Sequence, residues 1–495
     1  MDEIQKTASE SPKYIPTIGL EIHAELNTSS KMFCSCKNDP DEEKPNVNIC
    51  PICLGHPGTL PVLNKEAIKH VLKIGVAING TLADFTEWDR KNYFYPDIPK
   101  GYQISQYKFP LVSGGELKGV AVERVHLEED TAQSTHDQHE KSLVNFNRSG
   151  VPLMELVTKP VIHDALTAVN FAKELQLLLR YLGAGEANME KGEMRVEANI
   201  SIATPENTAI GKFGTKTEVK NLNSFRAVER AIAYEIERQT EILESAERGG
   251  EEKVKQETRG WNDAKQETYS QRSKESSHDY RYFPDPDIPK MKISELAEFS
   301  KEKLSGELPE LPWIKRDRYK KDYGMTDKEV AVFVEELELA MYFEAIIKLF
   351  TNDKARIKLT TNYLLSDYLG LLKTAKKTFD SHSAISVSSF AELMTMVSSG
   401  DISSRGAKDT LALLMNQPAI SAREIAEKNG LLQKSDTSDL GPIIDKIVFD
   451  NSAVVLEYKA GKVASLQFLI GQAMKATKGS ANPEVVKKLL TQKLG

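Results

Sequence analysis

Acidic residues and a histidine alternate with apolar residues in the stretch GLEIHAEL, residues 19–26. Successive side chains of a β-strand point to opposite faces, so Glu21, His23 and Glu25 would share one face and the apolar residues the other. Carboxylates and an imidazole on one rigid face could bind a divalent cation. A half-buried strand with a solvated polar face would show the same alternation.

Four further stretches place acids inside or beside apolar runs. A carboxylate in an apolar strand is costly to bury unless it is paired or bound to a metal. Each acid alone could be a salt-bridged core residue, but together with Glu21 and His23 they favour one shared site. Oxygen-rich ligation with one histidine suits Mg²⁺ or Mn²⁺ better than Zn²⁺. The stretches are VERVHLEED (122–130), PLMELV (152–157), RVEANIS (195–201) and KTEVKNLN (216–223).

All four cysteines lie within the 20 positions from 34 to 53, spaced as C-x-C and C-x-x-C. Four thiolates at this spacing could hold zinc tetrahedrally, which would leave no open position for chemistry. Such a site would be structural and would fix residues 32–61 beside the first strand. Two disulfides or free buried thiols are the alternatives. The cysteines are Cys34, Cys36, Cys50 and Cys53.

Two stretches combine aromatic residues with Pro-Asp turns: residues 89–103 (DRKNYFYPDIPKGYQ) and 279–290 (DYRYFPDPDIPK). Because proline restricts φ, both could be rigid loops at the rim of one cleft, with cations available for phosphate or carboxylate. Two packed surface turns would give the same pattern. The candidate residues for binding substrate or phosphate are Arg90, Lys91, Arg148, Lys216 and Arg281.

The elements that would position these residues change in kind along the chain. Alternating strand patterns and apolar residues at helical spacing are mixed up to about residue 295. From there onward the patterns are helical, with a further break near residues 400–406. The sequence therefore predicts three domains: an α+β domain over 1–295, an all-α middle domain over 296–404 and an all-α tail over 405–495.

The composition is that of an ordinary soluble protein, with 40% hydrophobic and 28% charged residues. No apolar run approaches the roughly 18 residues of a membrane helix. The first residues are polar and acidic and show no signal-peptide pattern, so we expect a cytoplasmic protein.

The net charge of −7 argues against a whole-chain polyanion binder, but the C-terminal end differs. Residues 459–495 contain seven lysines and one glutamate, which gives 7 − 1 = +6. Such a stretch could follow a phosphate backbone, although a solvated helix face would look alike. The candidate nucleic-acid contacts are Lys475, Lys478, Lys487 and Lys488.

Taken together, the motifs resemble the B subunit of the tRNA-dependent (aspartyl/glutamyl-tRNA(Asn/Gln)) amidotransferases over residues 15–494. The resemblance implies an N-terminal cradle related to glutamine synthetase, with an antiparallel sheet and a zinc knuckle. It also implies a helical middle domain and a helical tail that binds the tRNA elbow. The motifs are GLEIHAEL, DRKNYFYPDIPKGYQISQY, HLEED, NRSGVPLMELV, RVEANISI, FGTKTEVKNLNSF, DYRYFPDPDIP and FLIGQAMKATKGSANP.

The resemblance also implies site residues and partners. His23, Glu129 and Glu155 would bind Mg²⁺, and an adjoining metal position would be formed by Glu21, Glu197 and Glu218. Many members have Asp where this chain has Glu197, and some lack the cysteine loop. ATP would be the phosphoryl donor, and an amidase A subunit with a small C subunit would complete a heterotrimer.

The implied reaction phosphorylates the side-chain carboxylate of Glu-tRNA(Gln), Asp-tRNA(Asn) or both, and ammonia then attacks the acyl phosphate. The chain has no Walker A loop, no Gly-rich Ser-Ser-Lys amidase pattern and no cysteine outside the cluster to serve as a glutaminase nucleophile. Ammonia would therefore come from the partner. The alternatives are a non-enzymatic zinc-stapled tRNA-binding scaffold and a stand-alone ligase for a free amino acid, against which the basic tail argues.

Overall fold

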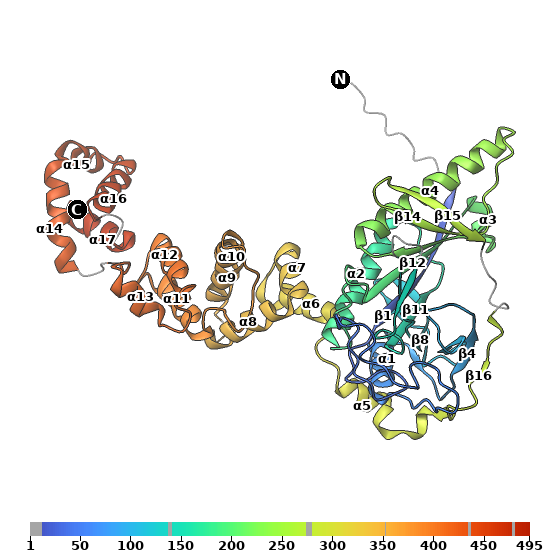
Figure 1. Cartoon of the computed structure of the whole chain (residues 1–495). Coiled ribbons are helices and arrows are strands. Elements are labelled where there is room, and N and C mark those ends of the chain that lie inside the picture. The colour runs from blue at the N-terminus through green and yellow to red at the C-terminus, as the bar shows by residue number, and fades with distance from the viewer. Residues whose placement is uncertain (1–11, 137–140, 274–279, 352, 434–436, 478–480) are drawn as a thin grey trace. The chain divides into compact units, whose positions relative to one another are not determined.

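The chain forms two compact units, residues 1–312 and 313–495. The computed structural model describes residues 12–136, 141–273, 280–351, 353–433, 437–477 and 481–495. Within these ranges every strand lies in the first unit, and the second unit is helical (Figure 1). The predicted change from an α+β to an all-α region is confirmed.

A large sheet with β1 (Ile15–Glu25) at its centre organises the first unit. β1 is antiparallel to β11 (Pro152–Thr158) on one side and to β12 (Met194–Ala203) on the other. The strand order is β15-β14-β13-β12-β1-β11-β8-β6-β2, with β7 paired to β8 and only β13–β14 parallel among these pairs. The outer strands are β2 (Thr81–Leu82), β6 (Val112–Ser113), β7 (Glu116–Leu117), β8 (Val120–Glu129), β13 (Thr217–Leu222), β14 (Glu257–Asn262) and β15 (Glu267–Ser273).

The two faces of β1 differ as the alternation predicts. Leu20, Ile22 and Ala24 are fully buried, and α2 (Ala165–Tyr181) and α4 (Phe225–Glu247) pack on the sheet (Figure 1). Both helices begin with a side-chain cap that satisfies a free backbone N–H, from Asp164 and Ser224 respectively. The opposite face carries the polar side chains. The other helices of the unit are α1 (Lys65–Ala77), α3 (Pro205–Ala209) and α5 (Lys301–Gly306), with short 3₁₀ turns η2 (Ile293–Glu295) and η3 (Ala297–Phe299).

The two aromatic stretches are hydrogen-bonded to each other. β4 (Asp89–Asn92) pairs with β5 (Tyr102–Ser105) and, on its other edge, with β16 (Phe283–Pro284). Strand pairing therefore joins segments nearly 200 positions apart, which supports the prediction that both loops border one cleft. Two further pairs are β3 (Phe85–Thr86) with β17 (Met291–Lys292) and β9 (Gln133–His136) with β10 (Ser142–Asn145).

The first unit extends beyond the predicted boundary at residue 295. Lys69 and Lys73 of α1 form ion pairs with Glu307 at 2.7 and 3.0 Å, and Lys65 pairs with Glu298. These contacts attach α5 to α1, so the unit ends at residue 312. The helical pattern of residues 296–312 predicts their local structure. It does not show that the segment packs with the first unit.

In the second unit, α12 (Ser404–Leu414) and α13 (Ala422–Lys428) pack on α11 (Val387–Ser399). A separate apolar core begins with α14 and includes Leu440, Leu469 and Leu490. The boundary between the two apolar cores therefore lies after α13, whereas the predicted tail domain begins at residue 405. The remaining elements are α6 (Pro312–Tyr323), α7 (Asp327–Glu335), α8 (Leu337–Ile347), η4 (Lys348–Phe350), α9 (Lys354–Asn362), the π-helical η5 (Tyr363–Tyr368), α10 (Leu369–Thr374), α14 (Thr437–Asp450), α15 (Ser452–Lys459), α16 (Ala464–Ala476) and α17 (Pro483–Leu494).

Among the described residues, no helix combines the length and the apolar character needed to cross a membrane.

Candidate functional site

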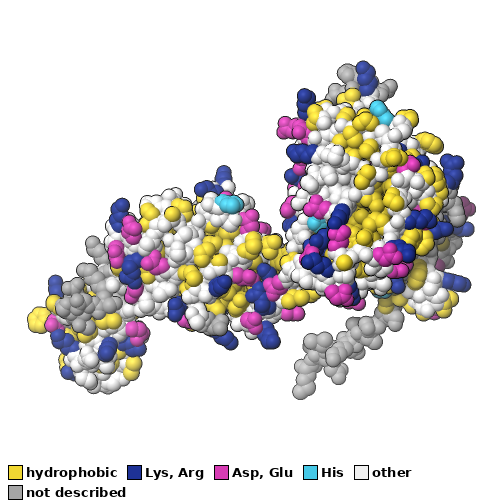
Figure 2. All heavy atoms as spheres, turned by 90° about the horizontal axis from the view of Figure 1, so that it is seen from below, with side chains coloured by type: hydrophobic (Ala, Val, Ile, Leu, Met, Phe, Trp, Pro, Cys, Tyr) yellow, Lys and Arg dark blue, Asp and Glu magenta, His cyan; other side chains and the backbone are white. Residues whose placement is uncertain are grey.

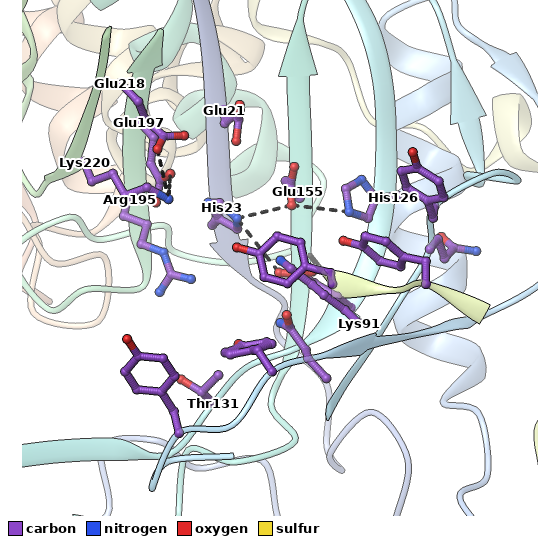
Figure 3. A pocket seen from close by; sticks show the side chains of 18 of the residues that line it. Glu21, His23, Lys91, His126, Thr131, Glu155, Arg195, Glu197, Glu218 and Lys220 are labelled. Atoms are coloured by element: carbon purple, nitrogen blue, oxygen red, sulfur yellow. Dashed lines mark ion pairs between the residues drawn. The ribbon is translucent and has the colours of Figure 1, made fainter. Parts of the chain in front are cut away.

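Strand register brings four residues of the site into one row across the sheet. His23 on β1 lies opposite Glu155 on β11 and Arg195 on β12, and Glu155 lies opposite His126 on β8. Directly opposed residues of antiparallel strands project to the same face. His126, Glu155, His23 and Arg195 therefore project together from four adjacent strands (Figure 3).

The first cluster consists of His23, Glu128 and Glu155, all buried, with one ligand atom of each within 4.8 Å of the others. His23 Nε2 lies 3.3 Å from Glu155 Oε2 and 3.9 Å from Glu128 Oε1. His126 Nε2 approaches the same Glu155 oxygen at 3.3 Å. Burial opposes ionisation of Glu155, but His126 and His23 outweigh it and hold the pKa of Glu155 well below its ordinary value.

Glu129, the residue carried over from the family resemblance, lies on the other side of β8. It accepts hydrogen bonds from Lys100 Nζ at 2.6 Å and from the backbone N–H of Ile104 at 2.9 Å. Glu128 instead lines the site together with His126. The reason is strand alternation: residues 126 and 128 share a face, and residue 129 does not. Applying the period of two to HLEED would have identified Glu128 from the sequence.

The second cluster brings together Glu21, Glu197 and Glu218, again within 4.8 Å. Glu21 lies opposite Glu197 in the β1–β12 register. Asn199 Nδ2 donates to Glu21 Oε1 at 2.7 Å, and Lys220 Nζ lies 2.9 Å from Glu197 Oε2. Burial, followed by repulsion from Glu155 and the other two acids of the cluster, raises the pKa of Glu21. A site with this excess of negative charge is suited to a cation.

Both clusters line one cavity of about 510 Å³. The sheet supplies an acidic floor that also carries Arg195 and Lys220, and Lys91 approaches it from β4 (Figure 3). Arg124 lines the same cavity. Burial lowers the pKa of Lys91, but Glu128, Tyr282 and Glu155 outweigh it and raise that pKa above its ordinary value. Lys91 is therefore a cation in the cavity. The remaining wall is aromatic, formed by Tyr93, Tyr95, Tyr107, Tyr280 and Tyr282.

Of the five cations predicted for phosphate or substrate, Lys91 lies in this lining. Arg90 pairs with Asp285 at 2.8 Å and Asp287 at 3.0 Å, and so joins the two aromatic loops. Arg148 lies at 2.6 Å from Asp130 and 2.9 Å from Glu25. These two arginines support the walls of the site.

The other two predicted cations lie outside the main cavity lining. Lys216 lines a neighbouring cavity of about 360 Å³ that also reaches Glu21. Arg281 is exposed, and its carbonyl accepts a hydrogen bond from Asn92. The sequence analysis did not identify three cations of the lining, Arg124, Arg195 and Lys220. Each lies two positions from a site residue on the same strand, so strand alternation would have predicted that it faces the site.

The four cysteines meet as the spacing predicts. Cys53 Sγ lies 3.3 Å from the sulfur of Cys34 and 3.7 Å from those of Cys36 and Cys50. Tetrahedral Zn–S bonds of about 2.3 Å would separate the sulfurs by about 3.8 Å, so the donor set fits zinc. The thiols are free, which differs from the alternative of two disulfides. The hydrogen bond from Cys34, with a contribution from Lys31, lowers the pKa of Cys53 to about 5.

A fully buried lysine connects the cysteine loop to the sheet. Lys31 Nζ donates to the carbonyls of Asn48 and Ser149 at 2.8 and 2.7 Å and to that of Phe146 at 3.2 Å. It also lies 3.9 Å from Cys53 Sγ. The cysteine loop is thereby tied to the segment that leads into β11, the strand that carries Glu155.

The predicted basic tail is partly neutralised. Lys475, Lys487 and Lys488 are exposed on α16 and α17, and Lys478 lies outside the described residues. Lys493 pairs with Asp445, which lies before residues 459–495 and is therefore not included in their net charge of +6. Lys462 pairs with Glu457 at 2.9 Å, again across that limit. The lysines available for a polyanion are therefore fewer than the sequence count indicates.

Comparison with known proteins gives matches over both units. Residues 16–298 match the family model described as the GatB/GatE catalytic domain, and residues 341–494 match the model described as the GatB domain. A curated relative from Gloeothece citriformis, named as the B subunit of an aspartyl/glutamyl-tRNA(Asn/Gln) amidotransferase, is 40% identical over 97% of this chain and 98% of its own length.

Relatives with the same name come from Persephonella marina, 40% identical over 97% of this chain and 100% of the relative, and from Thermoanaerobacter pseudethanolicus, 39% identical over 97% and 99%. The matches cover the strands that carry both acid clusters, the cysteine loop and the helical tail. On this evidence the chain belongs to the family of aspartyl/glutamyl-tRNA(Asn/Gln) amidotransferase B subunits.

Proposed function

We propose that this chain is the subunit that activates the misacylated tRNA in a glutamine-dependent amidotransferase. It phosphorylates the side-chain carboxylate of Glu-tRNA(Gln), Asp-tRNA(Asn) or both with ATP. It then directs ammonia to the resulting acyl phosphate. The observation that carries the proposal is the cavity that brings together two clusters of acidic residues, one of them with a histidine, and four cations. Phosphoryl transfer depends on positioning and on neutralising charge, and this arrangement supplies both.

His23, Glu128 and Glu155 would hold one Mg²⁺, with Glu128 in place of the Glu129 that the family resemblance implies. Glu21, Glu197 and Glu218 would hold a second cation beside it. The donor chemistry fits, because carboxylate oxygens predominate and one imidazole joins them. When bound, Mg²⁺ neutralises the charge of the transferring phosphoryl group.

The chain's own cations have a separate task in the reaction. Lys91, Arg124, Arg195 and Lys220 would orient the phosphate oxygens and stabilise charge that develops on them. The acceptor carboxylate attacks the γ-phosphorus, and the bond to the ADP oxygen breaks. Ammonia then attacks the carbonyl carbon of the acyl phosphate, inorganic phosphate leaves with the bonding electrons, and loss of a proton gives the amide.

The cysteine cluster would bind a structural zinc through Cys34, Cys36, Cys50 and Cys53. The sulfur separations of 3.3–3.7 Å and the buried Lys31 support this proposal. Zinc with four thiolates carries a net charge of −2, and the ammonium of Lys31, 3.9 Å from Cys53 Sγ, would offset part of it. The metal would then stabilise the segment that supports β11.

Ammonia would come from an amidase A subunit, with a small C subunit in the same heterotrimer. The first unit exposes apolar side chains, including Leu60, Val62 and Leu166, and Figure 2 shows apolar side chains gathered on one of its faces. Surfaces of this kind commonly mark protein interfaces. Within the second unit, Lys475, Lys487 and Lys488 are the described candidates for contact with tRNA. A cradle related to glutamine synthetase is proposed on the family resemblance.

The decisive assay uses the chain reconstituted with A and C subunits. ATP cleavage and amide formation are measured with Glu-tRNA(Gln) and with Asp-tRNA(Asn), each with and without Mg²⁺. Cleavage that depends on both Mg²⁺ and misacylated tRNA is the expected result, and it also identifies the substrate. If tRNA binds but no ATP is cleaved with either substrate, the chain is the zinc-stapled scaffold instead.

A further inference from the structure

The wall opposite the acidic floor is a chain of tyrosine rings. At one end of the wall, Tyr95 contacts Tyr93 with ring centroids 6.2 Å apart, and Tyr93 contacts Tyr280 at 5.9 Å. Tyr280 contacts Tyr282 at 6.1 Å, and Tyr282 stacks on Tyr107 at 4.4 Å with the planes 8° apart. All five side chains line the cavity, and they come from two loops distant in sequence.

Polar contacts hold the two loops that carry the wall together. Arg90 pairs with Asp285 and Asp287, and Asn92 Nδ2 donates to the carbonyls of Tyr280 and Arg281 at 3.2 and 2.9 Å. The guanidinium of Arg90 also lies over the ring of Tyr102, 4.3 Å from its centroid. These contacts fix the two loops relative to each other, which reduces the entropy lost when a ligand binds to the wall.

Both ends of the wall are exposed in a way that core aromatics are not. Tyr95 is 54% exposed and Tyr107 47% exposed, and the neighbouring Phe94 is 81% exposed. Tyr95 lines both the main cavity and a shallow outer hollow that Phe94 and Gly101 also border. Pro96 and Pro99 restrict the backbone between Tyr95 and Gly101. Aromatic faces are thus presented to solvent at the entrance of a cavity lined by charge.

We infer that this wall, with Tyr95 as its outer ring, is a stacking subsite for an adenine base. The inference rests on the proposed function, in which two substrates carry adenine: ATP and the 3′-terminal nucleotide of the tRNA. Planar bases stack on aromatic side chains, and their phosphates would lie toward the cations of the floor. Either source presents the same chemistry to the wall, and the experiment separates them.

The test places a fluorescent base, 2-aminopurine, either at the 3′ end of the misacylated tRNA or in the nucleoside triphosphate. Each probe is added to the reconstituted heterotrimer, since stacking quenches 2-aminopurine fluorescence. The variants are Tyr95→Leu, which removes the ring, and Tyr95→Phe, which keeps it. Tyr269→Leu is the matched control, because Tyr269 is 46% exposed on β15 of the same unit and lies outside the cavity lining.

We expect one of the two probes to be quenched by the wild-type complex and by Tyr95→Phe and Tyr269→Leu. Tyr95→Leu should relieve that quenching and raise the KM of the same substrate on the order of tenfold, consistent with the contribution of one stacked base. The KM of the other substrate should change much less. The probe that responds identifies the source of the base.

The subsite inference is overturned if the wild-type complex phosphorylates and amidates its tRNA while quenching neither probe. It is equally overturned if Tyr95→Leu and Tyr269→Leu raise the same KM to the same extent. A wild-type complex without Mg²⁺-dependent ATP cleavage would instead contradict the proposed function itself. The two failures are therefore distinguished before any variant is made.

Discussion

Glu128 and Glu129 are adjacent residues of the same type, but their side chains lie on opposite faces of β8. Glu128 faces His23 and Glu155 in the cavity, whereas Glu129 is held by Lys100 and the Ile104 amide behind it. Glu128 can share a cation with the histidine and the acid beside it, whereas Glu129 lies outside both acid clusters. The same residue type thus serves the chemistry at one position and the support of a loop at the next.

We therefore expect Glu128→Gln to abolish tRNA-dependent ATP cleavage, with a loss on the order of a thousandfold. Gln keeps the size of the side chain but removes the charge that binds the cation. His23→Ala should have a similar effect, and both variants should leave glutamine hydrolysis by the partner intact. The measurement is release of labelled phosphate from ATP in the presence of misacylated tRNA.

Glu129→Gln is the matched comparison. It leaves the buried Lys100 ammonium without its carboxylate, so we expect a fall in Tm and a smaller loss of turnover than in Glu128→Gln. If Glu129→Gln is inactive at full stability while Glu128→Gln turns over normally, the ligand assignment must return to Glu129.

Glu25 gives the first unit a pH-dependent stability term. Burial raises the pKa of Glu25 to about 7 from its ordinary 4.5, although Arg148 opposes this shift. The folded state therefore binds this proton more tightly than the unfolded state does. The resulting stabilisation is fully present below about pH 4.5 and is lost as the pH rises through about 7.

Glu25→Gln should remove this dependence, so the difference in Tm between variant and wild type should move in favour of the variant from pH 5 to pH 7.5. Thermal unfolding at several pH values measures it. Glu123→Gln, at an exposed position of β8, serves as the control and should show no such trend. Parallel Tm profiles for wild type and Glu25→Gln would refute the assignment.

At the scale of elements, the periodicity of the sequence predicted which residues of a strand share a face. The alternation of residues 19–26 placed Glu21 and His23 on one face of β1 and the apolar residues on the other, as the structure has them. The pairing of β4 with β16 could not be derived in this way. Those strands have four and two residues, too few to show a period, and their partnership is fixed by Arg90 bridging to a distant loop.

The zinc proposed for the cysteine loop would make the order of this element depend on a metal. We expect about one zinc per chain in the purified protein. Cys50→Ser should lower the zinc content and the Tm together, because a structural metal contributes folding free energy directly. Metal analysis and thermal unfolding give the two readouts, and the loss of activity should follow the loss of order. Less than about half an equivalent of zinc, with four thiols reactive in the native wild-type protein, would contradict the zinc site.

At the scale of the whole molecule, chemistry and tRNA contact are proposed for different units. Both acid clusters lie in the first unit, between Glu21 and Glu218, and the exposed lysines of α16 and α17 lie in the second. The sequence predicted this division by its change of texture. The compact units divide at residue 312 rather than at the predicted 295, because Lys69 and Lys73 pair with Glu307, and the separate core of α14–α17 is likewise a tertiary feature.

Deleting residues 434–495 tests the tail without disturbing the helices before it. The cut follows Gln433, whose N–H donates to the carbonyl of Asp401, and removes α14–α17 with their own core. Within the second unit it breaks a hydrogen bond from Asn482 to the carbonyl of Gly400 at 3.3 Å, a minor contact for α11–α13. The truncated chain should therefore keep its zinc, its assembly with the partners and the Tm of the first unit.

The truncated complex should lose affinity for tRNA, seen as a raised KM with a smaller change in kcat, because the lost contacts are made equally in the ground and transition states. Each lysine that neutralises a phosphate contributes to the salt dependence of binding, so the slope of log Kd against log salt should also become shallower. The triple variant Lys475→Gln, Lys487→Gln, Lys488→Gln should reproduce part of this change in slope, because the deletion also removes other lysines such as Lys446 and Lys459. If both altered chains keep the wild-type KM and slope, the lysines are a solvated helix face and tRNA contact must be sought on other elements.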